Sequence, residues 1–256
     1  MVTLWGNYEG ISQGSVFAEP VFKVAIMRKA ILLAGLLLST GHSWANIVIN
    51  GTRVLYPENN KEVIVQLMNT GDAPALVQSW IDDGDINSTP ETANVPFLLS
   101  PPVIKVNEHN GQQLRIKKLP SSLPADRESV FFLNVLDIPP RPENLQNQNT
   151  VQLAIKSRIK LFYRPAALKG TLDDAVAKLT LAAEGDRFRI TNNSPFHITV
   201  ANISLGKTKL LQESPMVSPF GQLTVAAKNT VKRGQTFQLM YVDDLGAYKT
   251  RTFTSQ

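Results

Sequence analysis

The sequence predicts an all-β protein made of two β-sandwiches, and three observations support this prediction. From residue 46 onward, short segments of alternating apolar residues are separated by turn residues, which is typical of sandwich folds. The stretch 151–163 (VQLAIKSRIKLFY) is apolar at nearly every odd position and mostly polar or basic at the even ones, which is the two-residue period of a strand. After Pro165 the pattern of short segments restarts. Two sandwiches joined near Pro165 are therefore the economical interpretation.

The first sandwich is expected to have about seven strands, the number of an immunoglobulin-like domain. Pro101 and Pro102 interrupt one apolar segment, which favours an edge strand or a switch between sheets at that point. The segment 129–138 (SVFFLNVLDI) is nearly all apolar, as expected of a central strand. In chain order the expected strands are 47–49, 52–56, 63–67, 75–81, 97–106, 114–116, 129–138 and 151–163.

The second sandwich is expected to follow the same scheme, with turns at 192–195 and 243–246. The only stretch that permits a helix is 171–183, and its valine, leucine and threonine content fits a strand at least as well. The expected strands are 179–181, 187–191, 197–205, 223–225, 237–242 and 248–253.

The stretch 151–163 is unusually long for one strand. At about 3.3 Å per residue it spans roughly 43 Å, whereas strands in globular domains usually have about five or six residues. We therefore expect it to cross between two bodies or to extend past its own sheet. It is either a long core strand or a strand whose first part is offered to another molecule, and the pattern alone leaves both interpretations open.

A secretory signal peptide is predicted at residues 27–45. Met27, Arg28 and Lys29 precede an apolar run at 30–38, and small residues lead to a cleavage site after Ala45. The apolar run is too short to span a bilayer. Residues 1–26 do not resemble part of a signal, so we interpret them as a mis-called start or non-native extension, or else as a genuine extension with little order. The mature chain would have 256 − 45 = 211 residues.

The composition argues against most catalytic classes. The chain has 256 residues, no cysteine and a net charge of +5 from scattered cations, which excludes thiol chemistry and is only weak evidence for a nucleic-acid partner. No nucleophile-elbow, zinc-protease or phosphate-loop motif is present. The isolated His109 and His197 do not suggest a metal site. Asp82, Asp83 and Asp85 lack the spacing of a calcium loop, so solvated loop carboxylates are expected there. The sequence therefore predicts no catalytic residue, metal or cofactor.

Three motifs resemble the periplasmic pilus chaperone family, whose members are PapD-like. They are DRES at 126–129, IPPRPE at 138–143 and IKLFYRPAAL at 159–168, and the resemblance covers 46–256. It implies two immunoglobulin-like domains, 46–165 and 166–256, in a boomerang arrangement with an inter-domain cleft. It also implies a non-enzymatic function in the periplasm. The resemblance further implies a chaperone that binds pilus or fimbrial subunits by donor-strand complementation and delivers them to an outer-membrane usher.

The resemblance assigns roles to two groups of residues around the long strand. Arg53 and Lys160 match the pair that anchors the subunit's terminal carboxylate, and each charge-assisted hydrogen bond is worth on the order of 1.5–3 kcal/mol. Val151, Leu153 and Ile155 match the alternating donor residues of the long strand. Lys160 has the opposite parity to Ile155, so a regular strand would direct them to opposite faces. We expect strand twist, a bulge or a lysine that reaches around the edge to reconcile them.

Glu128, Arg164 and Asp244 match the family's buried inter-domain ion network, which is expected to fix the angle between the domains. Asp243 is the alternative to Asp244, but alignment on Tyr241 and Gly246 favours Asp244.

The loop between the IPPRPE motif and the long strand is short and has no cysteine pair, which predicts the short-loop subclass of chaperones. The rival interpretations are a pilus subunit or adhesin, an exported sugar-binding sandwich and a sandwich hydrolase. The sugar-binding class needs clustered exposed aromatic residues, yet Trp80 is the only tryptophan after residue 45. An open apolar edge strand also favours self-association, so a self-capping homodimer of the free protein is a further hypothesis.

Overall fold

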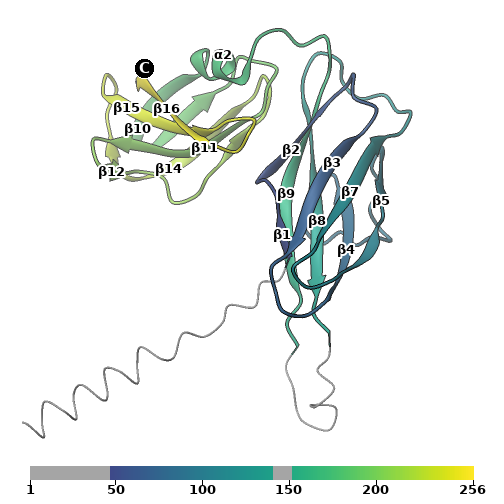
Figure 1. The fold of residues 1–256 in the computed structure, drawn as a ribbon. Coiled ribbons are helices and arrows are strands. Elements are labelled where there is room, and N and C mark those ends of the chain that lie inside the picture. Colours follow the sequence, from purple (N-terminus) through teal and green to yellow (C-terminus); the bar gives the residue numbers. More distant parts are fainter. Residues whose placement is uncertain (1–46, 141–151) are drawn as a thin grey trace, which may run out of the picture. The chain divides into compact units, whose positions relative to one another are not determined.

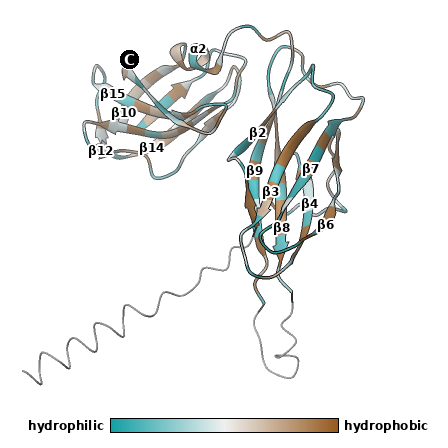
Figure 2. Cartoon of the chain, in the orientation of Figure 1, coloured by the Kyte–Doolittle hydropathy of each residue, from teal (hydrophilic) through white to brown (hydrophobic). Residues whose placement is uncertain are grey.

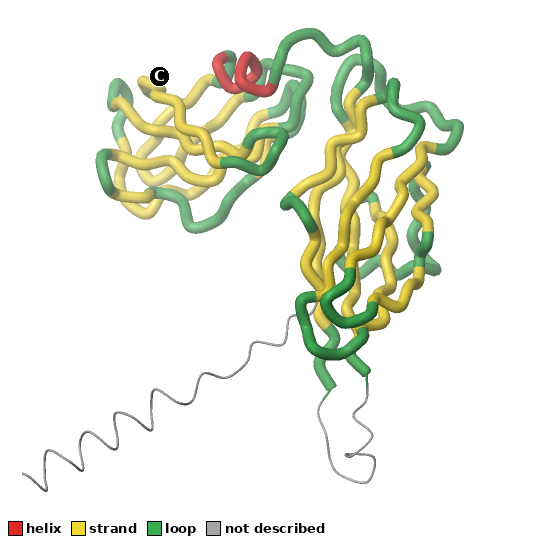
Figure 3. Tube along the Cα trace, viewed as in Figure 1, coloured by secondary structure: helices red, strands yellow, loops and turns green. Residues whose placement is uncertain are grey.

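The structure is a computed structural model that describes residues 47–140 and 152–256 (Figure 1). These residues form two β-sandwiches and one short helix, which confirms the predicted all-β fold with two immunoglobulin-like domains (Figure 3). The predicted signal peptide, the short loop and the predicted donor residue Val151 lie outside the described residues. In the part of the chain that the structure describes, no helix is long and apolar enough to cross a membrane.

The first sandwich contains a four-stranded and a five-stranded sheet, with strand orders β1-β3-β7-β5 and β2-β9-β8-β4-β6. Strand β8 lies between β9 and β4, as predicted from its apolar sequence. The strands are β1 (Ile47–Ile49), β2 (Arg53–Pro57), β3 (Val63–Asn69), β4 (Ala75–Asp82), β5 (Phe97–Ser100), β6 (Val103–Val106), β7 (Gly111–Lys118), β8 (Ser129–Ile138) and β9 (Ile155–Arg164).

Two of the points at which the chain changes sheets in this sandwich lie in short connections that contain proline or glycine. Pro101 and Pro102 separate β5, which pairs with β7, from β6, which pairs with β4. The predicted switch at these prolines is therefore confirmed, and a proline suits such a point because it has no N–H for a strand ladder. The other switch separates β1 from β2 at Gly51, whose φ of 124° is open to glycine. This second switch brings β2 alongside β9.

The first core lies between the two sheets, because apolar and polar side chains alternate along the strands and the apolar ones point inward. Figure 2 shows this alternation as brown and teal. Tyr56 is 1% exposed, and its hydroxyl satisfies two backbone groups, accepting from Lys118 N at 3.0 Å and donating to Lys61 O at 3.2 Å. The aromatic rings of Tyr56 and Phe97 pack edge to face. The fully buried aliphatic residues of this core include Leu67, Leu114, Ile116, Leu133 and Leu161.

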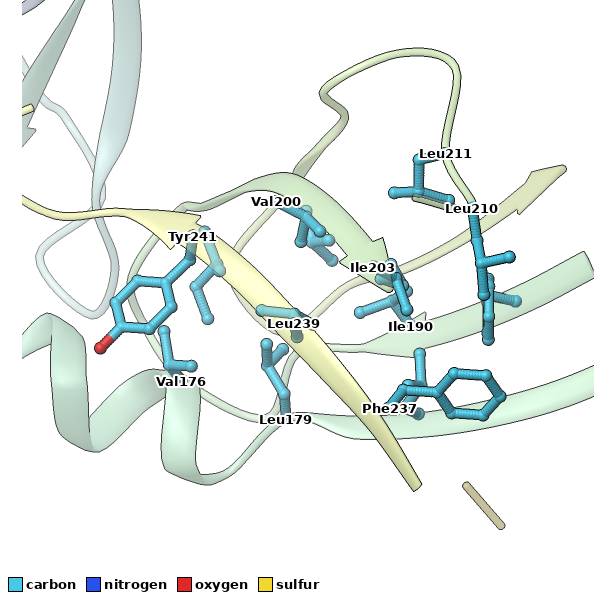
Figure 4. Packing of buried hydrophobic residues seen from close by; sticks show 14 of the residues in the cluster. Val176, Leu179, Ile190, Val200, Ile203, Leu210, Leu211, Phe237, Leu239 and Tyr241 are labelled. Atoms are coloured by element: carbon cyan, nitrogen blue, oxygen red, sulfur yellow. The ribbon is translucent and has the colours of Figure 1, made fainter. Parts of the chain in front are cut away.

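The second sandwich contains a two-stranded sheet, β10-β14, and a five-stranded sheet, β12-β11-β15-β16, in which β13 pairs with β11. The rings of Phe188 and Phe237 cross at 87° in its core. Figure 4 shows Val176 and Tyr241 at one end of this core and Leu210 and Leu211 at the other. The strands are β10 (Thr180–Thr191), β11 (Ile198–Leu205), β12 (Thr208–Lys209), β13 (Met216–Val217), β14 (Gln222–Val231), β15 (Thr236–Val242) and β16 (Tyr248–Thr254).

The helix α2 (Leu172–Ala177) corrects the expectation that residues after Thr171 fit a strand at least as well. The Thr171 hydroxyl accepts a hydrogen bond from Asp174 N, and the Asp174 carboxylate accepts one from Thr171 N. This capping box satisfies backbone donors that an uncapped helix leaves open. Leu172 and Val176 then bury their side chains in the second core. The threonine and aspartate spacing was the signal that the strand interpretation missed.

Candidate functional site: the free edge of strand β9

Strand β9 is paired along its whole length on one edge and only in part on the other. It pairs antiparallel with β8 from Ile155 to Tyr163, whereas the parallel partner β2 begins at the pair Arg53–Lys160. Within residues 47–140 and 152–256, no strand pairs with the second edge between Ile155 and Ile159. Such an edge presents unpaired N–H and C=O groups that can pair with another chain. We call this segment the β9 free edge.

The predicted donor residues are not sealed in the core. Leu153 is 73% exposed and Ile155 is 44% exposed, although both are aliphatic. Strand β9 begins only at Ile155, so Leu153 lies before the strand. Of the residues that the structure describes, 152–154 were wrongly predicted as strand. The exposure favours the interpretation in which the first part of the segment is offered to another molecule.

The two faces of β9 separate Lys160 from the aliphatic residues. Ile159 and Leu161 pair across β8 with Leu133 and Phe131 and pack in the first core. Lys160 therefore points to the opposite face. The register between β8 and β9 runs without a shift, so a bulge does not reconcile the two parities. The opposite parities of Lys160 and Ile155 are nevertheless compatible with one binding site. Arg53 and Lys160 lie where the free edge ends, and a strand added to that edge would also end there.

Arg53 and Lys160 are direct neighbours across the parallel pair of β2 and β9. One Arg53 nitrogen, Nη1, donates to Val242 O at 3.2 Å, but its Nε is buried without a hydrogen-bond partner. The Arg53 guanidinium carbon lies 5.6 Å from the centre of the Phe162 ring. Lys160 forms no hydrogen bond or ion pair with any residue that the structure describes. Two adjacent, partly buried cations are thus left without an adjacent anion.

The environment disfavours both positive charges. Burial lowers the pKa of Arg53, and the nearby carboxylates of Asp244 and Asp243 offset this only in part. Burial also lowers the pKa of Lys160, and the positive charges of Arg53 and Arg158 lower it further. An anion bound between the two side chains would relieve this repulsion. A carboxylate suits the pair best, since it accepts hydrogen bonds from both a guanidinium and an ammonium group.

Arg164, at the end of β9, links two acidic residues. Its Nε donates to Glu128 Oε1 at 2.7 Å, and its Nη1 and Nη2 each donate to Asp244 at 2.7 Å. Burial alone would lower the pKa of Arg164, but the carboxylates of Asp244 and Glu128 outweigh burial and raise that pKa. Asp243 does not bind Arg164; its Oδ1 instead accepts from the backbone of its own turn, at Leu245 N.

His197 joins this group and was not foreseen as a partner. Glu128, which is only 3% exposed, accepts a hydrogen bond from His197 N at 2.7 Å with its second oxygen. No periodic or motif signal predicts this contact, because the backbone N–H of any residue other than proline can make it.

Asp82 corrects another expectation, since it is not a solvated loop carboxylate. It is 1% exposed at the end of β4, where Arg158 Nη2 lies 2.5 Å from its Oδ1 and Asn134 Nδ2 lies 2.6 Å from its Oδ2. Burial alone would raise the pKa of Asp82, but the hydrogen bonds from Arg158 and Asn134 outweigh burial and lower that pKa. The Arg158 guanidinium stacks over Phe132, with 3.7 Å from its carbon to the ring centre. Arg158 is therefore already neutralised, unlike Lys160 two residues later on the same face.

A two-sandwich fold with an open strand edge that ends in two cations without an ion pair is suited to binding an extended chain segment. Comparison with known families specifies the class. The model described as "Pili and flagellar-assembly chaperone, PapD N-terminal domain" matches residues 46–169. The model described as "Pili assembly chaperone PapD, C-terminal domain" matches residues 174–253. The chain therefore belongs to the PapD-like pilus chaperones, a family of non-enzymatic binding proteins.

Individual relatives agree with this assignment. The chain is 42% identical over 204 residues to the "Probable fimbrial chaperone YehC" of Escherichia coli K12, covering 80% of this chain and 84% of that protein. It is 43% identical over 206 residues to the "Chaperone protein MrkB" of Klebsiella pneumoniae, covering 79% and 88%. The crystal structure of the CupB2 chaperone of Pseudomonas aeruginosa is 31% identical with a TM-score of 0.69, covering 82% of this chain and 100% of that one. These relatives favour a chaperone over the rival pilus subunit.

Proposed function

We propose that this protein is a periplasmic chaperone that binds pilus subunits by adding the β9 free edge to them and delivers them to an outer-membrane usher. The observation that carries this proposal is the free edge itself, with exposed Leu153 and Ile155 along it and the unpaired cations Arg53 and Lys160 at its end. The names of the relatives as fimbrial chaperones support the class of partner.

The charges at the end of the free edge select the direction of the bound strand. A strand parallel to β9 places its carboxyl terminus at Arg53 and Lys160, just where β2 begins. An antiparallel strand would place a positive amino terminus against the same two cations. Each charge-assisted hydrogen bond to the carboxylate contributes on the order of 1.5–3 kcal/mol. The bound segment is therefore the carboxyl-terminal strand of the subunit, and the cation pair fixes its register.

The side chains before the cations supply the apolar contact. Leu153 and Ile155, together with Val151 outside the described residues, are proposed as the donor residues that fill the subunit's groove. Burying one such aliphatic side chain contributes roughly 1.5–3 kcal/mol. The main-chain ladder adds affinity that does not depend on the subunit's sequence. Leu153 and Ile155 are exposed in the free protein, so the free energy of their burial can contribute to binding.

Several further assignments belong to the same proposal. We assign residues 27–45 to a signal peptide. The limits 46–165 and 166–256 are proposed for the two domains, set in a boomerang arrangement whose angle is held by Glu128, Arg164 and Asp244. The chain is assigned to the short-loop subclass. A homodimer in which two free edges cap each other is proposed for the unbound protein, because an exposed edge favours self-pairing.

The proposal is tested by co-expressing a pilus subunit with the chaperone and measuring how much subunit is recovered from the periplasm bound to it. Arg53→Ala and Lys160→Ala should each abolish recovery, while circular dichroism shows that both variants are folded. Lys117→Ala is the matched control, since Lys117 is exposed on β7 and should leave recovery unchanged. Undiminished subunit recovery with either cation removed would refute the carboxylate anchor.

A further inference from the structure

The second sandwich also has an open strand edge, at β14. This strand pairs antiparallel with β10 on one side. In the described part of the chain, no strand pairs with its other edge between Gln222 and Ala227. The edge is closed beyond that point, because Lys228 N donates a hydrogen bond to Leu210 O at 2.8 Å. We call the segment from Gln222 to Ala227 the β14 free edge.

A cavity lies directly against this edge. After Leu210 the chain turns away from β14, and Pro215 O accepts from Val200 N at 2.8 Å, which ties the chain to strand β11 instead. The space left between the departing segment and β14 is about 440 Å³. Its lining comes from both sides, with Leu211, Glu213 and Pro215 on one and Leu223 and Val225 on the other, so the cavity itself contains one carboxylate. The cavity therefore occupies the place of a missing neighbouring strand.

The core beneath this edge is incompletely covered. Leu223, Val225 and Ala227 alternate along β14 and pack against the second core, but each is only partly buried. Leu210 and Leu211, by contrast, are 2% and 3% exposed and mark the end of the core where the edge closes (Figure 4). A strand added to the β14 free edge would place alternate side chains over the three partly buried residues.

The closed end of the edge is positively charged. Lys209 and Lys228 flank the hydrogen bond that closes it, and both side chains are exposed. Neither lysine side chain forms an ion pair or hydrogen bond with any residue described in the structure. A negative group at that end of an added strand would meet two free ammonium groups, so charge complementarity specifies an anionic terminus there.

We propose that the β14 free edge is a second peptide-binding site, which takes an extended segment of a partner protein. The segment runs parallel to β14, has aliphatic residues at alternate positions and ends in a free carboxylate between Lys209 and Lys228. Six residues of open edge span about 20 Å, which fits an ordinary strand of five or six residues. This site lies in a different sandwich from the β9 free edge and does not depend on the function proposed above.

Hydrogen exchange measured by mass spectrometry on the full chain tests this site. The probe is the synthetic hexapeptide acetyl-Thr-Val-Thr-Val-Thr-Val with a free carboxylate, compared with the same peptide amidated. The free-acid peptide should slow exchange of the amides at 222–227, and amidation should weaken the effect at least tenfold. The charge-reversed variant Lys209→Glu/Lys228→Glu should lose the slowing, whereas the matched control Lys169→Glu/Lys232→Glu should keep it.

The same experiment separates the two edges. Binding at the β9 free edge is seen in the amides at 155–159 and is removed by Arg53→Ala, which should leave the slowing at 222–227 intact. Three results would overturn the proposal: no slowing at 222–227, equal slowing by the acid and the amide, or slowing that appears without peptide as the protein concentration rises. The last would identify a second copy of this chain as the occupant.

Discussion

Lys160 carries its positive charge in surroundings that disfavour it. Burial and the neighbouring Arg53 and Arg158 act in the same direction on this ammonium group, and no carboxylate of the described residues pairs with it. A residue that destabilises the free protein in this way is typical of a binding site, where the partner supplies the missing charge. We therefore propose that Lys160 serves binding rather than the stability of the fold.

We predict that Lys160→Met raises the thermal midpoint of the free protein. The gain in the free energy of unfolding should be less than about 1 kcal/mol, because solvent screens part of the repulsion. The folded-state pKa of Lys160 lies below its ordinary 10.5, so the unfolded chain binds more protons between the two values. Wild-type stability therefore gains with rising pH in that window. The advantage of the variant should shrink as the pH approaches 10.5. Lys117→Met, at an exposed lysine of β7, is the control. A destabilised Lys160→Met would contradict the prediction.

Asp82 represents the opposite case, a charge that the fold fully satisfies. We predict that Asp82→Asn lowers the free energy of unfolding by about 3 kcal/mol, because Arg158 loses its buried partner. The pKa of Asp82 is held below its ordinary 3.8, so its contribution is complete above pH 3.8 and disappears as the pH falls through the lowered value. Urea unfolding of wild type and variant at neutral and acidic pH measures this. Asp83→Asn, at an exposed loop residue, is the control. If wild type and Asp82→Asn still differ in their free energy of unfolding at low pH, the ionised Asp82 carboxylate is not the source of the stabilisation.

The resemblance pointed to the two cations of the proposed anchor as a pair, whereas strand patterns alone contain no register that places them side by side. The motif IKLFYRPAAL identified Lys160 and Arg164 by resemblance, but only the parallel pairing of β2 with β9 shows that Arg53 stands beside Lys160. Asp82 was misjudged because it opens a glycine- and aspartate-rich stretch that reads as a loop. Its burial depends on Arg158, far away in the sequence, and a single local pattern does not contain that information.

At the scale of elements, strand β9 has a first part that is paired on one edge only and a second part that is paired on both edges. Leu161 is fully buried in the first core, whereas Leu153 and Ile155 are exposed on the same parity. The two-residue period continues through both parts, so the pattern predicted a strand without showing where the core ends. The partner strand β2 marks that point, and a pairing between distant segments is not visible in either one alone.

We predict that Leu153→Lys weakens subunit binding without lowering the thermal midpoint of the chaperone. Leu153 is 73% exposed in the free protein, so its burial in the complex contributes roughly 1.5–3 kcal/mol to binding. The variant lacks this contribution, which corresponds to about a tenfold to hundredfold weaker affinity. Titration of a purified subunit peptide measures the affinity, and calorimetry measures the midpoint. Leu119→Lys, at a 40% exposed leucine away from β9, should change neither quantity. A collapse of folding in Leu153→Lys would place this residue in the protein's own core instead.

Helix α2 shows how a local signal can outweigh composition. Valine, leucine and threonine favour strands in general, yet Thr171 and Asp174 form a capping box that fixes the start of a helix. Turn and cap residues act through specific hydrogen bonds, so a few of them decide an element whose average propensity is ambiguous. The strands of both sandwiches were predictable because each repeats the same signal over many residues.

At the scale of the whole molecule, Arg164 connects residues from both halves of the chain. Glu128 precedes β8 in the first sandwich, and Asp244 follows β15 in the second. The resemblance to a family pointed to these three residues, while periodicity and spacing did not. Ion pairs between distant segments depend on the final packing, so composition and strand patterns carry no trace of them.

We predict that the network acts as a unit whose buried member dominates. Arg164→Met leaves the Glu128 carboxylate, with 1% of its side chain exposed, without its cation and should cost about 3–5 kcal/mol. Asp244→Asn should cost much less, because the Asp244 side chain is 35% exposed and Arg164 keeps Glu128. Glu128→Gln in the Arg164→Met background should recover part of the loss, since it removes the stranded charge.

Urea unfolding followed by tryptophan fluorescence and by circular dichroism distinguishes this arrangement from three independent surface pairs. In a chain that starts at residue 46, Trp80 is the only tryptophan and reports on the first sandwich, while circular dichroism reports on both sandwiches. If Arg164 couples the two sandwiches, the two signals coincide in the wild type and separate in Arg164→Met, because each sandwich then unfolds on its own. Lys249→Met removes a more exposed pair, with Asp173, within the second sandwich and should leave the signals coincident. Equal losses for Arg164→Met and Asp244→Asn, with no separation of the two signals, would mean that the network stabilises surfaces locally and does not join the halves of the molecule.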